Sequence, residues 1–285
     1  MIVLYVLTAG AYALLALHFW RTRWMRPAAP SPVRRHGMTP WERLAILVPL
    51  VLHTLLLNHA LFAAPELRFG FGLALSAMFW LTALLYWLES LLVPVEGMQA
   101  FILGAAAVCA PLPALFPGFA TPPAADTIAF RVHTILALGA YGLFTVAALH
   151  ALLMTLVERR LHAGAAGASA TGPLFGPGSS LPPLLTLERL LFRLIEAGFV
   201  LLSLTLLTGA IYSETIFGQA MRFSHKTLFA VVSWVIFAAL LAGRYAYGWR
   251  GRTALRWTLA GFLTLLLAYV GSRFVLEVIL QRTVG

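Results

Sequence analysis

The sequence has few cysteines and few charged residues. Cys109 is the only cysteine among 285 residues, so the chain can form no internal disulfide and contains no Cys-x-x-Cys redox or Cys-x-x-Cys-His haem-attachment motif. It also lacks a Gly-rich phosphate loop, a Gly-x-Ser-x-Gly motif and a His-Glu-x-x-His motif. These absences exclude thiol chemistry and the common signatures of nucleotide, serine-hydrolase and metalloprotease sites. We interpret Cys109 as a small packing residue.

Hydrophobic residues, in contrast, make up 61% of the chain, and charged residues only 11%. No soluble domain of this size has such a balance, so we predict an all-α, polytopic integral membrane protein. About 20 apolar residues are enough to cross a bilayer. Eight apolar runs are candidates for membrane-spanning helices, at about 2–20, 44–64, 69–92, 97–116, 131–157, 190–212, 227–243 and 254–278. The first lacks the basic start of a signal peptide, so we expect a retained helix.

The basic residues predict the topology. Although the net charge is +10, the basic residues lie between apolar runs, which favours orientation in a membrane over nucleic-acid binding. Fourteen of the 20 Lys and Arg residues flank the first, fifth and seventh connections. By the positive-inside rule these connections are cytoplasmic, and both termini lie on the outer, periplasmic side. A Gly/Ala/Ser/Pro-rich linker at about 164–181 would join helices 1–5 to helices 6–8 within a single domain, 1–285.

Histidines inside the apolar runs are the main candidate functional residues. His133 and His150 lie 17 residues apart on the fifth run, or roughly 25 Å along a helix. An ionisable group within a membrane marks a functional site by default. The predicted topology brings His133 and His225 to the outer ends of two helices, where two imidazoles could be axial ligands of haem iron. Alternatively, each is an interfacial residue bonded to water or a carbonyl. His18 and His150 fall towards the inner side and are expected to face the interface or a packed partner.

Three further features allow two interpretations each. His53, near the middle of the second run, is either a haem or substrate contact or part of a buried hydrogen bond between helices. The outer stretch 212–226 either pairs Arg222 or Lys226 with a haem propionate or forms an interfacial turn. The intramembrane carboxylates form either a proton path or paired helix ends. These carboxylates are Glu89, Glu196 and Glu277.

The sequence between residues 130 and 278 resembles a known family. The combinations LPPLLTLERLLFR, GWRGRTALRW and GSRF are similar to those of the cytochrome c assembly membrane proteins, the CcsA, ResC and HemX group. The resemblance implies haem handling at the outer face of the bacterial inner membrane. It puts His133 at the first external histidine of the family, His225 at the second or its neighbour, and His53 at a histidine within the membrane.

One departure bears on the function that the resemblance implies. Haem-presenting members of the family carry a tryptophan-rich outer segment, whereas the equivalent stretch here, SETIFGQAMRFSHK, has no tryptophan. We therefore expect an accessory haem-binding protein without catalytic residues of its own, surrounded by lipid and working with other cytochrome assembly proteins or another inner-membrane protein. The alternative is a membrane partner or transporter-like subunit with structural or proton-linked histidines.

Overall fold

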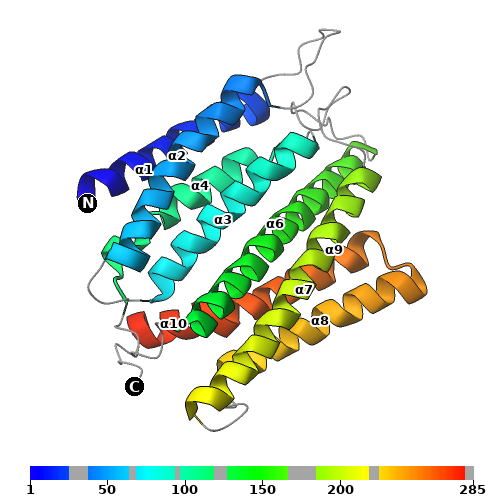
Figure 1. Cartoon of the computed structure of the whole chain (residues 1–285). Coiled ribbons are helices and arrows are strands. Elements are labelled where there is room, and N and C mark those ends of the chain that lie inside the picture. The colour runs from blue at the N-terminus through cyan, green and yellow to red at the C-terminus, as the bar shows by residue number, and fades with distance from the viewer. Residues whose placement is uncertain are drawn as a thin grey trace.

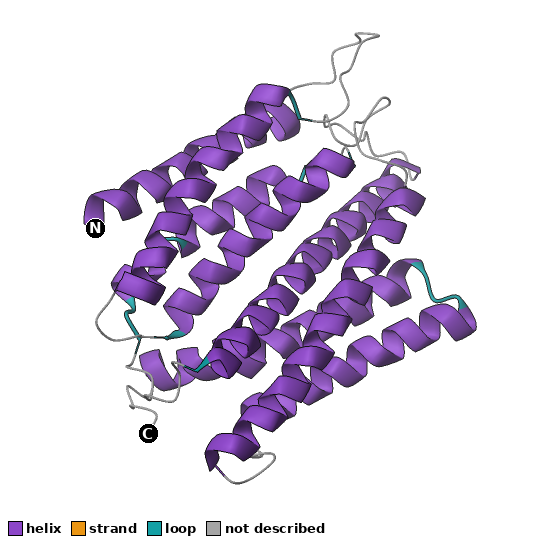
Figure 2. Ribbon diagram, in the orientation of Figure 1, coloured by secondary structure: helices purple, strands orange, loops and turns teal. Residues whose placement is uncertain are grey.

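The computed structural model describes residues 1–25, 38–63, 69–93, 97–118, 127–165, 184–217 and 225–279. All regular secondary structure in these ranges is helical, which confirms the predicted all-α class (Figure 2). Most of the predicted linker at 164–181, and Arg222 with its neighbours, lie outside the described residues.

The helices follow the predicted apolar runs. Those of the first half are α1 (Ile2–Phe19), α2 (Pro40–Asn58), α3 (Phe71–Leu92), α4 (Gln99–Cys109) and α5 (Leu112–Leu115). Those of the second half are α6 (Ile128–Ala165), α7 (Leu184–Phe217), α8 (His225–Tyr247), α9 (Gly251–Leu266) and α10 (Ser272–Phe274). Short π-helical turns extend α1 and α2 and join α9 to α10. A further π-helical turn, Val275–Ile279, follows α10.

Seven helices of the described chain are long and apolar enough to cross a membrane, and the fourth predicted crossing is shorter. It divides into α4 and the single turn α5, which together cover Gln99–Leu115. The break has a local cause, because α4 ends just before Pro111. A proline has no amide hydrogen to donate, so Pro111 cannot form the backbone hydrogen bond that would continue α4.

Successive helices run in alternating directions through one bundle (Figure 1). The N-terminus, the start of α6, the start of α8 and α10 lie at one end of this bundle, which we call the terminal end. The predicted placement of both termini on one side agrees with this arrangement; that this side is periplasmic stays a prediction. α6 packs chiefly against α7 and also contacts α3 and α9, so helices on both sides of the predicted linker pack together.

An aromatic pair joins the helices of the second half. The rings of Phe144 on α6 and Phe237 on α8 stack with their centroids 3.8 Å apart, and both side chains are fully buried. Glycines on the other two helices leave room for these rings. A Cβ at Gly198 of α7 would lie 3.1 Å from the Phe144 ring, and one at Gly261 of α9 would lie 2.8 Å from the Phe237 ring. Small residues therefore let four helices approach closely, as is typical of membrane bundles.

Gly261→Ala is expected to lower the free energy of unfolding by about 1–3 kcal/mol, because the added methyl group must displace the Phe237 ring from a well-packed site. Gly10→Ala is the matched control, since a Cβ there meets nothing within 4 Å. Thermal unfolding of both variants in the same detergent measures the difference. Equal melting temperatures for the two variants would contradict the close packing at Gly261.

Candidate functional site

His133 lies one turn into α6 at the terminal end and faces α7. Its side chain is partly buried, and its Nδ1 lies 3.1 Å from Oγ1 of Thr208. The ring also lies against the backbone of α7, because a Cβ built on Gly209 would be 3.1 Å from its Cε1. No hydrogen bond joins Nε2 to another described residue. One nitrogen of this imidazole is therefore held by the protein, while the other is available to a ligand.

His225 is the first residue of α8 and is exposed at the same end of the bundle (Figure 1). The register of α8 against α7 is set by a hydrogen bond of 2.8 Å from Nε1 of Trp234 to Oγ of Ser203. Counting from this bond at 1.5 Å per residue, His225 lies roughly 6 Å further towards the terminal end than Thr208. The two predicted imidazoles thus lie at similar depths on helices that both pack against α7.

Two cationic side chains lie beside this end of α8. Nζ of Lys226 and Cζ of Arg273 each lie 5.7 Å from the ring centroid of Tyr269, close enough for cation–π attraction. The Tyr269 ring packs edge-on against Phe69, which precedes α3. The terminal end therefore combines an exposed imidazole, positive charge and aromatic surface. Of the two cations predicted to pair with a propionate, Lys226 belongs to this cluster, and Arg222 lies outside the described residues.

His53 is fully buried between α1, α2 and α3. Its Nε2 lies 2.8 Å from Oγ of Ser76, and its Nδ1 lies 3.4 Å from the hydroxyl of Tyr12. Both ring nitrogens therefore have hydroxyl partners in this conformation. Of the two interpretations, this geometry favours the hydrogen bond between helices over a haem contact.

His150 forms a second buried polar contact, this time between α6 and α3. Its Nε2 lies 3.0 Å from Oε1 of Glu89, and its Nδ1 lies 3.0 Å from the carbonyl oxygen of Val146. His150 is fully buried, and Glu89 is 8% exposed. The expectation that His150 faces a packed partner is confirmed, and Glu89 is a paired residue near the end of α3.

Ion pairs and a hydrogen bond join helices at the end of the bundle opposite His133. The buried Glu42 at the start of α2 lies 3.1 Å from Nε2 of His18 and 3.0 Å from Nη2 of Arg23. Glu196 accepts a hydrogen bond of 2.6 Å from the hydroxyl of Tyr245. His18 and Glu196 thus have protein partners, as one of the predicted alternatives required. Side chains of Glu277 and its neighbour Leu276 lie outside the described residues.

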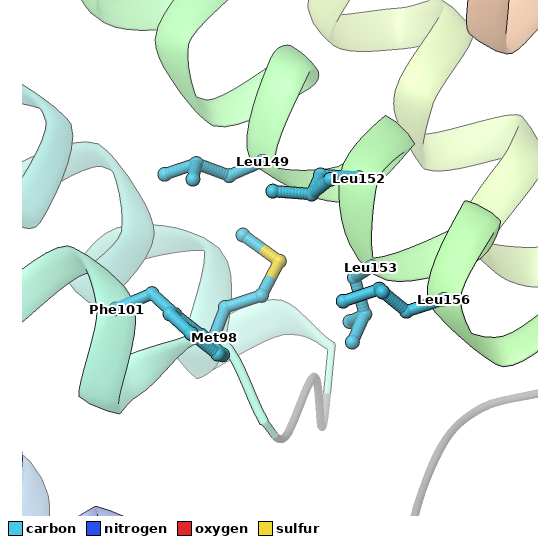
Figure 3. Close-up of a pocket in the computed structure, with 6 residues that line it drawn as sticks. All are labelled: Met98, Phe101, Leu149, Leu152, Leu153 and Leu156. Atoms are coloured by element: carbon cyan, nitrogen blue, oxygen red, sulfur yellow. The ribbon is translucent and has the colours of Figure 1, made fainter.

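One cavity lies between α4 and α6, far from His133. Met98, Phe101 and four leucines of α6 line it, and all six side chains are apolar (Figure 3). The nearest of these leucines along α6, Leu149, is roughly 24 Å from His133. Within the described ranges, no three His, Cys, Asp or Glu side chains gather into a metal site. The candidate ligands that the structure offers at the terminal end are the imidazoles of His133 and His225.

Comparison with known proteins identifies the family. The model of the cytochrome c assembly protein family matches residues 41–280. The chain belongs to this family. Inner membrane protein YpjD of Escherichia coli is 35% identical over 148 residues, which are 52% of this chain and 52% of YpjD. Cytochrome c biogenesis protein CcsA of Prochlorococcus marinus is 39% identical over 88 residues, which are 31% of this chain and 28% of CcsA.

These matches confirm the predicted family, and the chain spans about half the length of YpjD. With seven helices of spanning length, the protein is a multi-pass protein of the inner membrane, as predicted. Sequence reasoning missed Thr208 and Ser76, which contact predicted histidines from other helices. No local pattern indicates such partners, because they depend on which helices are neighbours.

Proposed function

We propose that this cytochrome c assembly family protein binds haem at the terminal end of its bundle, between His133 and His225, and assists cytochrome c assembly in an accessory role. The observation that supports this function most directly is the presence of two imidazoles at similar depths on α6 and α8, one partly buried and one exposed. Two histidines on opposite faces of a porphyrin give axial ligation. The name of CcsA, a relative in cytochrome c biogenesis, agrees with this role.

The residues at this end fit a haem group by their chemistry. Nδ1 of His133 is held by Thr208, and no side chain of the described residues hydrogen-bonds to Nε2. Lys226 follows His225 directly, and Arg273 shares the Tyr269 ring with it, so the cluster offers cations for the negatively charged propionates. When bound, haem supplies the redox chemistry, and the protein supplies ligands, orientation and charge. The absence of tryptophan from residues 213–226 supports an accessory role over a synthase.

The test is the absorption spectrum of the full chain, purified in detergent and titrated with ferric haem b. Wild-type protein is expected to bind one haem per chain with a low-spin Soret spectrum. His133→Ala and His225→Ala are each expected to lose the low-spin spectrum, because each removes one axial ligand. The double variant is expected to lose haem binding.

His59→Ala is the matched control. His59 is an exposed histidine at the terminal end, on the turn that follows α2, so its loss should leave the spectrum unchanged. Wild-type protein that stays colourless, or His133→Ala and His225→Ala variants that bind haem as wild type does, would rule out this function. In that case a membrane partner with structural histidines is the better description.

A further inference from the structure

We infer that Thr208 is a positioning residue that fixes the tautomer of His133, so that the proton lies on Nδ1 and the lone pair on Nε2. This inference rests on the proposed haem function, which gives the tautomer its role. The contact itself involves only side chains of this protein. A histidine ligand binds iron through an unprotonated ring nitrogen. Which nitrogen is unprotonated depends on the hydrogen bond that the other nitrogen makes.

The single hydrogen of the Thr208 hydroxyl decides which group donates in the contact with His133. Oγ1 of Thr208 lies 2.8 Å from the carbonyl oxygen of Leu204 and 3.1 Å from that of Thr205, both on its own helix. A carbonyl can only accept, so the hydroxyl hydrogen points to one of these two oxygens. Oγ1 then presents a lone pair to Nδ1 of His133 at 3.1 Å. Nδ1 must therefore donate, and Nε2 of the neutral ring carries no hydrogen.

Gly209, the next residue of α7, makes this contact possible. A methyl group at this position would lie 3.1 Å from Cε1 of His133, which is closer than ordinary packing allows, and 3.7 Å from Nδ1. The glycine thus lets the imidazole approach the helix backbone, and the threonine before it fixes which ring nitrogen carries the hydrogen. Because α7 is long and packs along α6, both residues hold the ring on a rigid element.

This arrangement has the form of an outer-shell contact to a metal ligand. Histidine ligands usually donate their second ring N–H to an oxygen acceptor, and loss of that acceptor typically weakens metal affinity about 10–100-fold. Without Thr208, the His133 ring keeps only its contact with the backbone of Thr205, so its tautomer and orientation are held less firmly. The expected consequences are weaker haem binding and an altered midpoint potential, although Thr208 itself does not touch the iron.

The experiment compares three variants of the full chain in detergent micelles. Thr208→Val removes the acceptor at nearly constant volume, and Thr208→Ser restores it. Thr205→Val is the matched control, because the Thr205 hydroxyl also bonds to its own helix, at 2.7 Å from the Leu201 carbonyl oxygen, without a side-chain bond to His133. The protein is labelled with 15N-histidine, and the His133 resonance is assigned from its loss in His133→Ala.

The first readout needs no haem. The 15N chemical shifts of His133 are expected to report the Nδ1–H tautomer in wild type, Thr208→Ser and Thr205→Val, and a mixture of tautomers in Thr208→Val. Predominance of the Nε2–H tautomer in wild type would overturn the inference, even if Thr208→Val fails to fold. So would a His133 spectrum that is unchanged in a folded Thr208→Val variant.

The second readout is titration with ferric haem b, together with the midpoint potential of the bound haem. We expect Thr208→Val to bind haem about 10–100-fold more weakly than wild type, with a shifted potential, and both other variants to behave as wild type. Haem binding by wild type that Thr208→Val leaves unchanged overturns the positioning role and leaves the haem function intact. The expected tautomers in a wild type that binds no haem support the Thr208 contact and overturn the haem function.

Discussion

Glu89→Leu is expected to lower the free energy of unfolding by about 3–5 kcal/mol, because breaking a buried polar pair leaves the remaining partner without compensation. The remaining partner is His150, which is fully buried on α6. Its Nε2 lies 3.0 Å from Oε1 of Glu89, and within the described residues neither this nitrogen nor either Glu89 oxygen has a hydrogen bond of good geometry to any other group. Equilibrium unfolding in mixed detergent micelles, followed by circular dichroism, measures the loss.

The positions of the hydrogens on His150 and Glu89 predict how other replacements of Glu89 should behave. Nδ1 of His150 lies 3.0 Å from the Val146 carbonyl oxygen and must donate to it. The contact between Nε2 and Glu89 therefore needs a proton of its own, carried either by the carboxyl group or by the imidazole. A glutamine amide can donate that hydrogen to Nε2. Glu89→Gln is accordingly expected to cost less than half as much as Glu89→Leu, although it removes the carboxylate entirely.

The double variant Glu89→Leu with His150→Leu gives the decisive comparison. Replacing both members of a buried pair by apolar residues of similar volume is often close to neutral. We therefore expect the double variant to be more stable than Glu89→Leu alone. If its loss instead equals the sum of the two single losses, the two side chains do not interact, and the close approach of α3 and α6 at this point has another cause.

The fold could be predicted from the sequence to a large extent because the bilayer imposes its thickness on every crossing. Each predicted apolar run is helical in the structure, although the fourth divides into α4 and α5, and most other errors lie at helix ends. α2 begins at Pro40, ahead of the predicted start at 44, because Thr39 and Glu42 form a capping box there. That pattern is visible in the sequence as Thr-Pro-Trp-Glu. Likewise, Pro111 marks the point where the fourth run breaks.

The sequence could predict how far along the bundle the candidate site residues lie. It could not predict which side chains of neighbouring helices they contact. Position along an apolar run brings His133 and His225 to one end of the bundle, and the structure has both there. The partners of a histidine depend instead on which helices are neighbours and how they are rotated. For this reason Thr208 beside His133, and Ser76 and Tyr12 beside His53, became visible only in three dimensions.

Glu42→Ala is expected to destabilise the protein by about 3–5 kcal/mol, the range for breaking a buried ion pair. The Glu42 carboxylate is 3% exposed and joins the end of α1 to the start of α2. It lies 3.0 and 3.2 Å from Nη2 of Arg23 and 3.1 Å from Nε2 of His18. It also accepts hydrogen bonds of 2.7 and 2.9 Å from the amide and hydroxyl of Thr39. One replacement therefore removes an ion pair and the cap of a helix.

Glu158→Ala is the matched control, since it also removes an acidic partner of an arginine but at the surface. The Glu158 side chain is 27% exposed, and that of its partner Arg252 is 62% exposed. Such a pair contributes only about 0–1 kcal/mol, because water screens it. Glu42→Gln should fall between the two alanine variants, since an amide oxygen can still accept from Thr39 while the charge is lost. Equal losses for Glu42→Ala and Glu158→Ala would mean that water reaches Glu42 and screens its pairs as it does at the surface.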